Sequence, residues 1–202
     1  WEQTALARPT PGIAFDFRFG YSSANTSPGA KIGSLDPYAN PALGLGWRHT
    51  FETRLIPEPF VQEIRILHWN GAIDTWFSTN NAFRTRHKEY RGELVQLPGA
   101  YEWTTSERIV YRFRDFQQGL IMSGRLSEIR DFNGNKVQIQ WNEDEGLITN
   151  VVDTAGGRFA FEYDSRNLLK KVSFQDWSAN FTYDQTNRLS SKSIKGPPEY
   201  AA

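Results

Sequence analysis

The chain has no cysteine among its 202 residues. Disulfide frameworks and thiolate metal sites are therefore excluded. An excess of charge is also missing, because Lys plus Arg and Asp plus Glu both number 23. Nucleic-acid-binding proteins usually carry net positive charge, so we expect no nucleic-acid partner. No apolar run approaches the roughly 18 residues of a membrane-spanning helix, so we expect no membrane insertion.

Helical periodicity is absent too, and alternation with a period of two takes its place. Aromatic residues make up 14% of the chain, and aromatic side chains suit the half-buried surface of a sheet. The segment GIAFDFRFGYSS, residues 12–23, alternates as a half-buried strand does. Its apolar face carries Ile13, Phe15, Phe17 and Phe19. We therefore predict an all-β fold.

Several other strands are expected before residue 114. Residues 47–55 alternate in the same way and predict one continuous strand. The segment EIRILHWNGAIDTWF, residues 63–77, predicts a hairpin that turns at Asn70-Gly71. Further strands are predicted around Phe83, at residues 94–97 and at residues 109–113.

From about residue 109 onwards a pattern repeats. Four segments, IVYRF, VQIQW, FAFEY and ANFTY, alternate and end on an aromatic residue. These aromatic residues are Phe113, Trp141, Tyr163 and Tyr183, of which the last three are 22 and 20 residues apart. A second segment follows each and is anchored by Leu126, Ile148, Leu169 and Leu189, at spacings of 22, 21 and 20. A period of this length predicts stacked antiparallel β-hairpins.

The residue after each of the last three aromatics is small and polar: Asn142, Asp164 and Asp184. Tyr-Asp could be a catalytic pair, but a catalytic pair is rarely copied at every strand end. An Asx side chain can instead accept a backbone N–H two residues further on and turn the chain. We therefore interpret these positions as structural, with the aromatic residue filling the layer between neighbouring hairpins.

These segments resemble a known repeat. FEYDSRNLLKKV and FTYDQTNRLSSK are similar to the tyrosine-aspartate (YD) repeats of the rearrangement-hotspot (Rhs) family, and GRLSEIRDFNGNKVQIQW follows the same pattern. Asn167 and Asn187 stand where the repeat usually has glycine, and asparagine also accepts a left-handed conformation. Trp141-Asn142 replaces Tyr-Asp in an earlier unit.

The upstream segments PGIAFDFRFGYSS and LGLGWRHTFETRL resemble the module that commonly precedes such repeats. Its most distinctive residues are Gly44, Gly46 and Trp47. We expect the two glycines to permit a tight backbone path and Trp47 to fill the adjacent apolar layer.

The resemblance implies three parts and a function. Residues 1–105 would be a β-rich N-terminal module, residues 106–195 the YD-type hairpins and residues 196–202 a proline-containing tail. Rhs proteins, the C components of toxin complexes and teneurins wrap such hairpins into a spiralling β shell, which in bacterial members encloses a C-terminal toxin. This chain would be the non-catalytic start of such a shell in a secreted or cell-surface protein.

The resemblance also implies partners. The remaining shell of the same protein and its C-terminal effector would contact this segment. The last expected strand, which runs through Leu189, would leave an open edge, and an open edge can pair with another chain or with a second copy.

Two other functions stay open. Exposed Tyr and Trp side chains would suit a carbohydrate-binding or adhesion module, whereas inward-facing Trp141, Tyr163 and Tyr183 would favour the shell. An enzyme would need a concave pocket with perturbed titratable groups. The three histidines do not have the spacing of metal ligands, so we expect neither a metal nor a cofactor.

Overall fold

The computed structural model describes residues 2–8, 13–22, 42–58, 62–79, 82–85, 92–116 and 121–197. These residues form 17 strands and one short 3-10 helix, and they contain no α-helix. The all-β prediction is therefore confirmed. Within the described ranges, no helix has the length and hydropathy that a membrane span requires.

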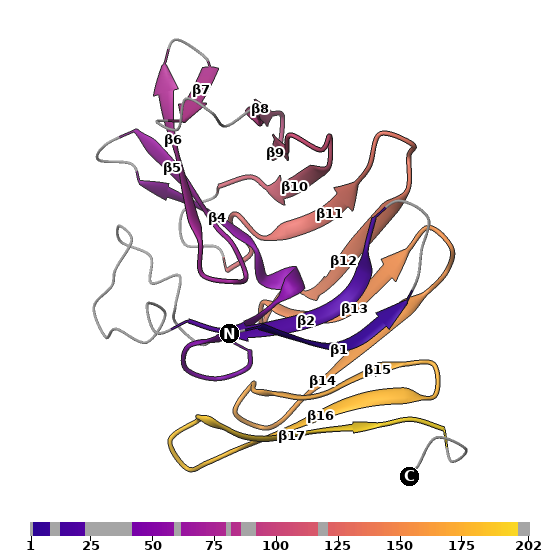
Figure 1. The fold of residues 1–202 in the computed structure, drawn as a ribbon. Coiled ribbons are helices and arrows are strands. Elements are labelled where there is room, and N and C mark those ends of the chain that lie inside the picture. Colours follow the sequence, from indigo (N-terminus) through magenta and orange to yellow (C-terminus); the bar gives the residue numbers. More distant parts are fainter. Residues whose placement is uncertain are drawn as a thin grey trace.

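The largest sheet has ten strands, each antiparallel to the strand before it in the chain. Figure 1 shows these strands following one another from β8 to β17. They are β8 (Glu93–Leu97), β9 (Ala100–Thr104), β10 (Val110–Arg114), β11 (Leu126–Arg130), β12 (Lys136–Asn142), β13 (Leu147–Asp153), β14 (Arg158–Tyr163), β15 (Leu169–Phe174), β16 (Trp177–Tyr183) and β17 (Leu189–Lys195). The predicted repeat hairpins thus lie side by side in one continuous sheet.

One face of this sheet is apolar and the other is polar, because successive side chains on a strand point to opposite faces. On β12, for example, Val137 and Ile139 are buried whereas Gln138 and Gln140 are exposed. The apolar face needs a cover, since an exposed apolar surface of this size would be unfavourable in water.

A three-stranded sheet supplies part of that cover, and Figure 1 shows it lying across the large sheet. Its strands are β1 (Glu2–Arg8), β2 (Phe15–Tyr21) and β3 (Trp47–His49). Phe15, Phe17 and Phe19 on β2 are fully buried, as their alternation predicted. Their rings contact the large sheet in three pairs, with centroids 4.6 Å apart for Phe15–Phe159, 5.8 Å for Phe17–Phe161 and 5.5 Å for Phe19–Phe181. The two sheets therefore share one aromatic core.

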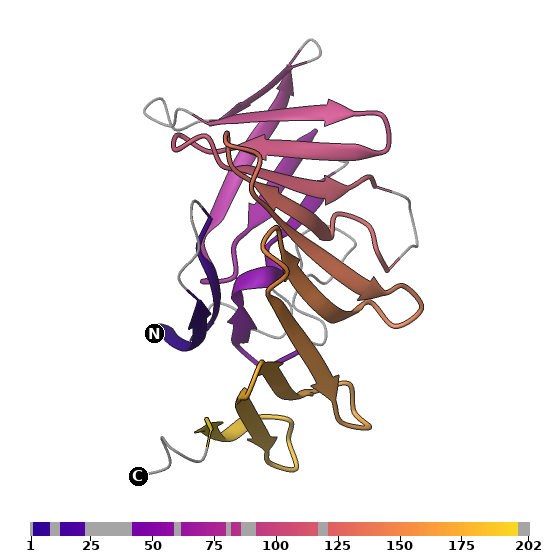
Figure 2. The same cartoon turned by 90° about the vertical axis from the view of Figure 1, so that its right-hand side faces the viewer.

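A third sheet of four strands lies at the β8 end of the molecule (Figures 1 and 2). Its strands are β4 (Arg54–Glu58), β5 (Glu63–Leu67), β6 (Ile73–Thr79) and β7 (Ala82–Thr85). The β5–β6 hairpin turns at the predicted place, with Gly71 at a φ of 88°. The sheet is tied to the large one where Leu55 N donates to Gly124 O at 2.9 Å.

The single strand predicted over residues 47–55 is wrong. The 3-10 turn η2 (Thr50–Glu52) interrupts it and separates β3 from β4, which belong to different sheets. The local cause is a reciprocal cap, in which the His49 ring accepts from Phe51 N while the Glu52 carboxylate accepts from His49 N. Alternation could not reveal this turn, because the two capping side chains, His49 and Glu52, also fit the alternating pattern of a strand.

Two strands were not expected, β1 and β9. The large sheet also starts upstream of the expected repeats, because β8 and β9 belong to it. The boundary placed between residues 105 and 106 therefore falls between two neighbouring strands, β9 and β10. Residues 198–202 of the expected tail lie outside the described residues.

Candidate functional site

The candidate site is the border of the large sheet, here named the Asx edge, at which the strands that bear the four aromatics end. Each aromatic lies opposite the anchor of its own hairpin. The pairs are Phe113–Leu126, Trp141–Ile148, Tyr163–Leu169 and Tyr183–Leu189. In all four hairpins the register shifts by one residue just before the aromatic, which is a β-bulge. The sequence brought these eight positions to notice, and the structure places them together in one row.

The bulge leaves one residue after each anchor without a partner in the register. These residues are Ser127, Thr149, Lys170 and Ser190. The Ser127 hydroxyl donates to Arg112 O at 3.0 Å and the Thr149 hydroxyl donates to Gln140 O at 3.2 Å. These two hydroxyls thus bond the strand opposite at the point where the regular pairing shifts.

The polar ends of the aromatics bond the hairpin before their own. Trp141 Nε1 donates to Leu126 O at 2.9 Å. The hydroxyl of Tyr163 donates to Ile148 O at 3.0 Å, and that of Tyr183 donates to Leu169 O at 2.7 Å. Each acceptor is the carbonyl of the preceding anchor, so the three bonds form a ladder along the edge. Phe113 begins the series, has no polar end and is completely buried.

The two tyrosines are suited to be permanent donors. Burial, reinforced by the negative charge of Glu52, raises the pKa of Tyr163 far above its usual range. Burial, and after it the negative charge of Glu52, also raise the pKa of Tyr183. Both hydroxyls are therefore protonated near pH 7 and can donate a hydrogen bond.

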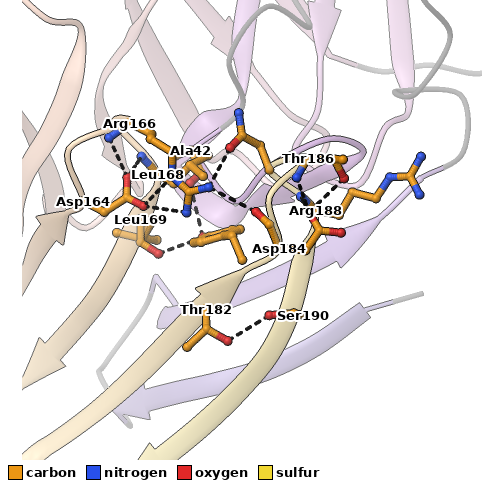
Figure 3. Close-up of polar contacts among 12 residues, drawn as sticks. Ala42, Asp164, Arg166, Leu168, Leu169, Thr182, Asp184, Thr186, Arg188 and Ser190 are labelled. Carbon is orange, nitrogen blue, oxygen red and sulfur yellow. Dashed lines mark hydrogen bonds and ion pairs between the residues drawn. The ribbon is translucent and has the colours of Figure 1, made fainter.

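Asp164 and Asp184 form the predicted Asx turns (Figure 3). Asp164 Oδ1 accepts from Arg166 N at 2.9 Å and Leu168 N at 3.0 Å. Asp184 Oδ1 accepts from Thr186 N at 2.8 Å and from Arg188 N at 2.9 Å. The fourth residue of each turn, counted from the Asp, has the predicted left-handed conformation, with φ of 61° at Asn167 and 62° at Asn187.

The same turn recurs at the opposite ends of these strands, in the segments DFNGN (131–135) and DTAGG (153–157), where the sequence predicts tight turns but not their Asx hydrogen bonds. Asp131 Oδ1 accepts from Asn133 N and Asn135 N, both at 2.9 Å. Asp153 Oδ1 accepts from Gly157 N at 2.6 Å. The fourth residue is again left-handed, with φ of 87° at Gly134 and 78° at Gly156. The pattern Asp-x-x-Gly/Asn was the available signal, and it marks a three-residue hairpin loop with a bulge.

Asn142 makes a longer version of the turn. Its Oδ1 accepts from Asp144 N at 3.2 Å and Glu145 N at 3.4 Å. The left-handed residue is Gly146, with a φ of 67°. The replacement of Asp by Asn at this position therefore coincides with one extra loop residue.

Arg166 connects two successive turns of the Asx edge (Figure 3). Its guanidinium donates to Asp164 Oδ2 through Nε at 3.1 Å and Nη2 at 3.0 Å. Its Nη1 donates to Asp184 O at 3.1 Å and Asn187 Oδ1 at 2.9 Å. Arg166 is exposed, so we expect these contacts to fix geometry more than to add stability.

Gly44, the first of the three distinctive upstream residues, contacts this same edge. Ala42 O accepts from Leu169 N at 2.6 Å, next to the Tyr183 hydroxyl (Figure 3). Gly44 has a φ of 81°, and a Cβ there would overlap the backbone carbonyl of Asn187. A glycine is thus required for two reasons, the left-handed backbone and the close approach.

Gly46 and Trp47 face the three-stranded sheet. Gly46 has a φ of 82°, and its carbonyl accepts from Ser22 N at 3.0 Å. The Trp47 ring lies 5.8 Å from Phe19 and 5.3 Å from Tyr21, centroid to centroid. Trp47 is half-buried and packs against the aromatic core.

A small buried polar cluster lies behind this contact, and sequence reasoning did not detect it. The Glu52 carboxylate accepts from Ala42 N at 3.2 Å and His49 N at 3.0 Å. Burial alone would raise the pKa of Glu52, but His49, Arg48 and these N–H donors outweigh it and lower the pKa. Burial lowers the pKa of His49, assisted by Arg48 and opposed by Glu52. Glu52 is therefore charged and His49 neutral near pH 7.

No protein-family model matches this chain, and no curated protein matches its sequence. The chemistry of the site must therefore be judged from its own residues. The cavity beside His49 and Glu52 measures about 20 Å³, which is far below the several hundred Å³ of ordinary ligand pockets. The perturbed groups of the cluster thus face no space for a substrate.

Metal ligation has no support in the described ranges. They contain no group of three or more His, Cys, Asp and Glu side chains arranged to hold an ion. His49 is enclosed in the core, and His68 Nε2 contacts Asp74 Oδ2 at 2.9 Å. His87 lies outside the described residues.

Proposed function

We propose that this chain is a non-catalytic structural segment of a secreted or cell-surface protein of the Rhs/YD-repeat type. It builds the start of a spiralling β shell that encloses or presents a C-terminal effector. The observation that carries the proposal is the ladder in which Trp141, Tyr163 and Tyr183 each bond the anchor carbonyl of the preceding hairpin. A contact that recurs from hairpin to hairpin can extend a sheet without limit, as in other repeat architectures.

The direction of extension follows from the ladder. The anchors Leu126, Ile148 and Leu169 already accept such a bond, so the carbonyl of Leu189 on β17 is the next acceptor in the series. A further hairpin with a Tyr or Trp at the equivalent position would continue the ladder. The partner of the β17 edge is accordingly the rest of the shell, and self-pairing is the competing use of that edge.

The orientation of the aromatics weighs against the adhesion alternative. Trp141, Tyr163 and Tyr183 pack against the apolar core and use their polar ends on backbone carbonyls. Sugar-binding platforms need an exposed ring face. Among the described residues the exposed aromatics are Tyr21 on β2, Phe132 in the β11–β12 turn and Trp177 at the start of β16, and no two of them lie on neighbouring strands.

The experiment that tests the shell proposal is limited proteolysis of the parent protein produced from its complete reading frame. We expect the region beyond the repeats to resist protease in the native protein and to become cleavable when Tyr163 and Tyr183 are both replaced by alanine. Arg158→Ala, on the exposed polar face of β14, is the control and should leave protection unchanged. Cleavage of the downstream region in the native protein at the same rate as in the double variant would overturn the proposal.

A further inference from the structure

In the part of the chain that the structure describes, Nε2 of the His49 ring is buried and has no hydrogen-bond partner. His49 is completely buried and lies among aromatic rings, with centroids 5.2 Å from Phe17 and 5.6 Å from Phe161. Its Nδ1 accepts from Phe51 N at 3.4 Å. In a neutral imidazole the other nitrogen then carries the hydrogen, so Nε2 is a donor.

This Nε2 has no hydrogen-bond partner among the residues that the structure describes. The carboxylate of Glu52 is close, but its Oε2 lies 3.8 Å away, beyond direct hydrogen-bond reach. A buried donor that is left without an acceptor costs about 1–3 kcal/mol. Two polar groups at such a separation are commonly bridged by water.

The cavity of about 20 Å³ lies at the right place, because both His49 and Glu52 line it. A single water needs roughly 10–15 Å³ measured in this way, together with two to four polar partners. Arg125 completes the polar part of the wall. The other two polar side chains that line it, Trp141 and Tyr163, direct their donors to Leu126 O and Ile148 O instead.

We propose that this cavity is a binding site for one structural water molecule, which accepts a hydrogen bond from His49 Nε2 and donates one to the Glu52 carboxylate. An ion fits the same wall less well. An anion would face the Glu52 carboxylate, and a cation would face the guanidinium of Arg125. A neutral molecule with both a donor and an acceptor satisfies both sides.

The water has a structural role beyond the satisfaction of His49. The wall of the cavity includes Ala42 and Glu52 from the N-terminal part of the chain and Ile148 and Tyr163 from the repeat sheet. The site therefore lies at the contact between the two parts, directly behind the bond from Leu169 N to Ala42 O. The water fills the polar gap that these two surfaces leave when they meet.

The test combines crystallography at atomic resolution with NMR of the same chain. We expect an ordered water within hydrogen-bond distance of both His49 Nε2 and a Glu52 carboxylate oxygen. In solution, the Nε2–H proton should be observed and should show a cross-peak to water from a long-lived bound molecule. A direct His49–Glu52 hydrogen bond, a proton on Nδ1, or absence of the water from the density would each overturn the proposal.

Two variants sharpen the result. His49→Phe keeps an aromatic ring in the aromatic cluster but removes the donor, and it should lose both the water and its cross-peak. Glu52→Gln leaves one acceptor oxygen where two now accept from Ala42 N and His49 N, so it should lower the occupancy of the water while His49 Nε2–H stays in place. If His49→Phe fails to fold, the wild-type NMR experiment alone still decides between the outcomes. Retention of the same water in a folded His49→Phe would contradict the assignment of His49 as its donor.

Discussion

At the scale of single residues, the tyrosines of the Asx edge combine two functions that usually belong to different side chains. The ring of Tyr163 packs in the layer between hairpins, while its hydroxyl bonds Ile148 O in the preceding hairpin. Phe113 performs only the first function, because its ring is buried and has no polar end. The two functions can therefore be separated by substitution.

Tyr163→Phe should lower the free energy of unfolding by about 1 kcal/mol, since it removes one hydrogen bond and keeps the ring. Tyr163→Ala should cost about 3 kcal/mol or more, because it also removes the buried ring. Urea denaturation measures both values. Tyr111→Phe is the matched control, as Tyr111 is a half-buried strand tyrosine whose hydroxyl shows no hydrogen bond in the described part of the chain. Equal losses for Tyr163→Phe and Tyr163→Ala would contradict the division of functions.

Asp164→Ala should be milder than Tyr163→Ala, with a loss nearer 1 kcal/mol. It removes a half-buried turn acceptor of two local backbone bonds, from Arg166 N and Leu168 N, and leaves the aromatic layer in place. Chemical denaturation of the two variants under identical conditions gives the comparison. A larger loss for Asp164→Ala would mean that the turn, and not the aromatic layer, holds the hairpins together.

At the scale of elements, the loop from Ala42 to Trp47 contacts the ends of the last two Asx turns, those of Asp164 and Asp184. Leu169 N reaches Ala42 O because the bulge after Leu169 interrupts regular pairing at that point. Gly44 then lies against the backbone of Asn187. The loop thus fits the end of the repeat sheet through backbone atoms and leaves little room for side chains.

Gly44→Ala should be more destabilising than Gly156→Ala. Both glycines are left-handed, with φ of 81° and 78°, so both substitutions introduce comparable backbone strain. Only the Cβ at residue 44 meets another atom, since nothing lies within 4 Å of the one at residue 156. The difference between the two decreases in the free energy of unfolding, measured by urea denaturation, therefore reports the contact with Asn187.

Hydrogen exchange should localise that difference. In Gly44→Ala, amides of residues 184–189 should exchange faster than in the wild type, whereas Gly156→Ala should leave them unchanged. Identical unfolding free energies for the two variants, with identical exchange, would show that the close approach has no energetic weight.

The edge strand β17 calls for its own exchange measurement. Amides of Phe181 and Tyr183 do not report the edge, because these residues lie on β16 and are paired with β17, which is the outer strand. Every second amide of β17 points away from β16, and we expect these to exchange rapidly in a dilute sample of residues 1–202. Protection of all β17 amides, independent of concentration, would show that the edge is already covered.

The parts of the fold that could be predicted from the sequence are the local ones. Alternation located β2 and the repeat strands, and the spacing of Tyr163 and Tyr183 located the hairpins, because hairpin pairing joins neighbours in the chain. The turns at Asp131 and Asp153 carried a readable signal in their Asp-x-x-Gly pattern. The capped turn at His49 and the β1 and β9 strands had no comparable pattern.

Only the local part of the candidate site could be predicted from the sequence, because its other contacts join segments that are distant in the chain. The aromatics and the Asx residues stand out as a repeat, but the acceptors of the ladder are backbone carbonyls, which no side-chain pattern reveals. The cluster of His49 and Glu52 depends on Ala42 and on repeat residues distant in the chain. Only the folded arrangement brings these together.

At the scale of the whole molecule, mild acid should weaken the fold through His49. Its pKa lies below the usual 6.5 in the folded state, first because of burial. The unfolded chain takes up a proton near 6.5, whereas the folded chain resists it until a lower pH. The contribution of neutral His49 is therefore complete above about pH 6.5 and is lost as the pH falls toward its folded pKa. Glu52, with its lowered pKa, acts in the same direction below about pH 4.5.

Denaturation of the wild type and of His49→Phe between about pH 7.5 and 5 tests this, since only the wild type loses the His49 contribution across that range. Arg48 and Glu52 next to the ring, and Arg125 across the cavity, are unchanged in the variant. His68→Phe is the control, because His68 is paired with Asp74 near the surface. Parallel pH profiles for the wild type and His49→Phe would rule out His49 as the sensitive group.

The aromatic core shared by β2 and the repeat strands imposes an order on folding. Each repeat hairpin pairs residues that are close in the chain, so it can form as soon as its own two strands exist. Phe15, Phe17 and Phe19 instead pack on Phe159, Phe161 and Phe181, at the other end of the described chain. During synthesis the phenylalanines of β2 therefore stay uncovered until β14 to β16 have emerged. An uncovered apolar face of this kind makes a growing chain prone to aggregation and a substrate for chaperones.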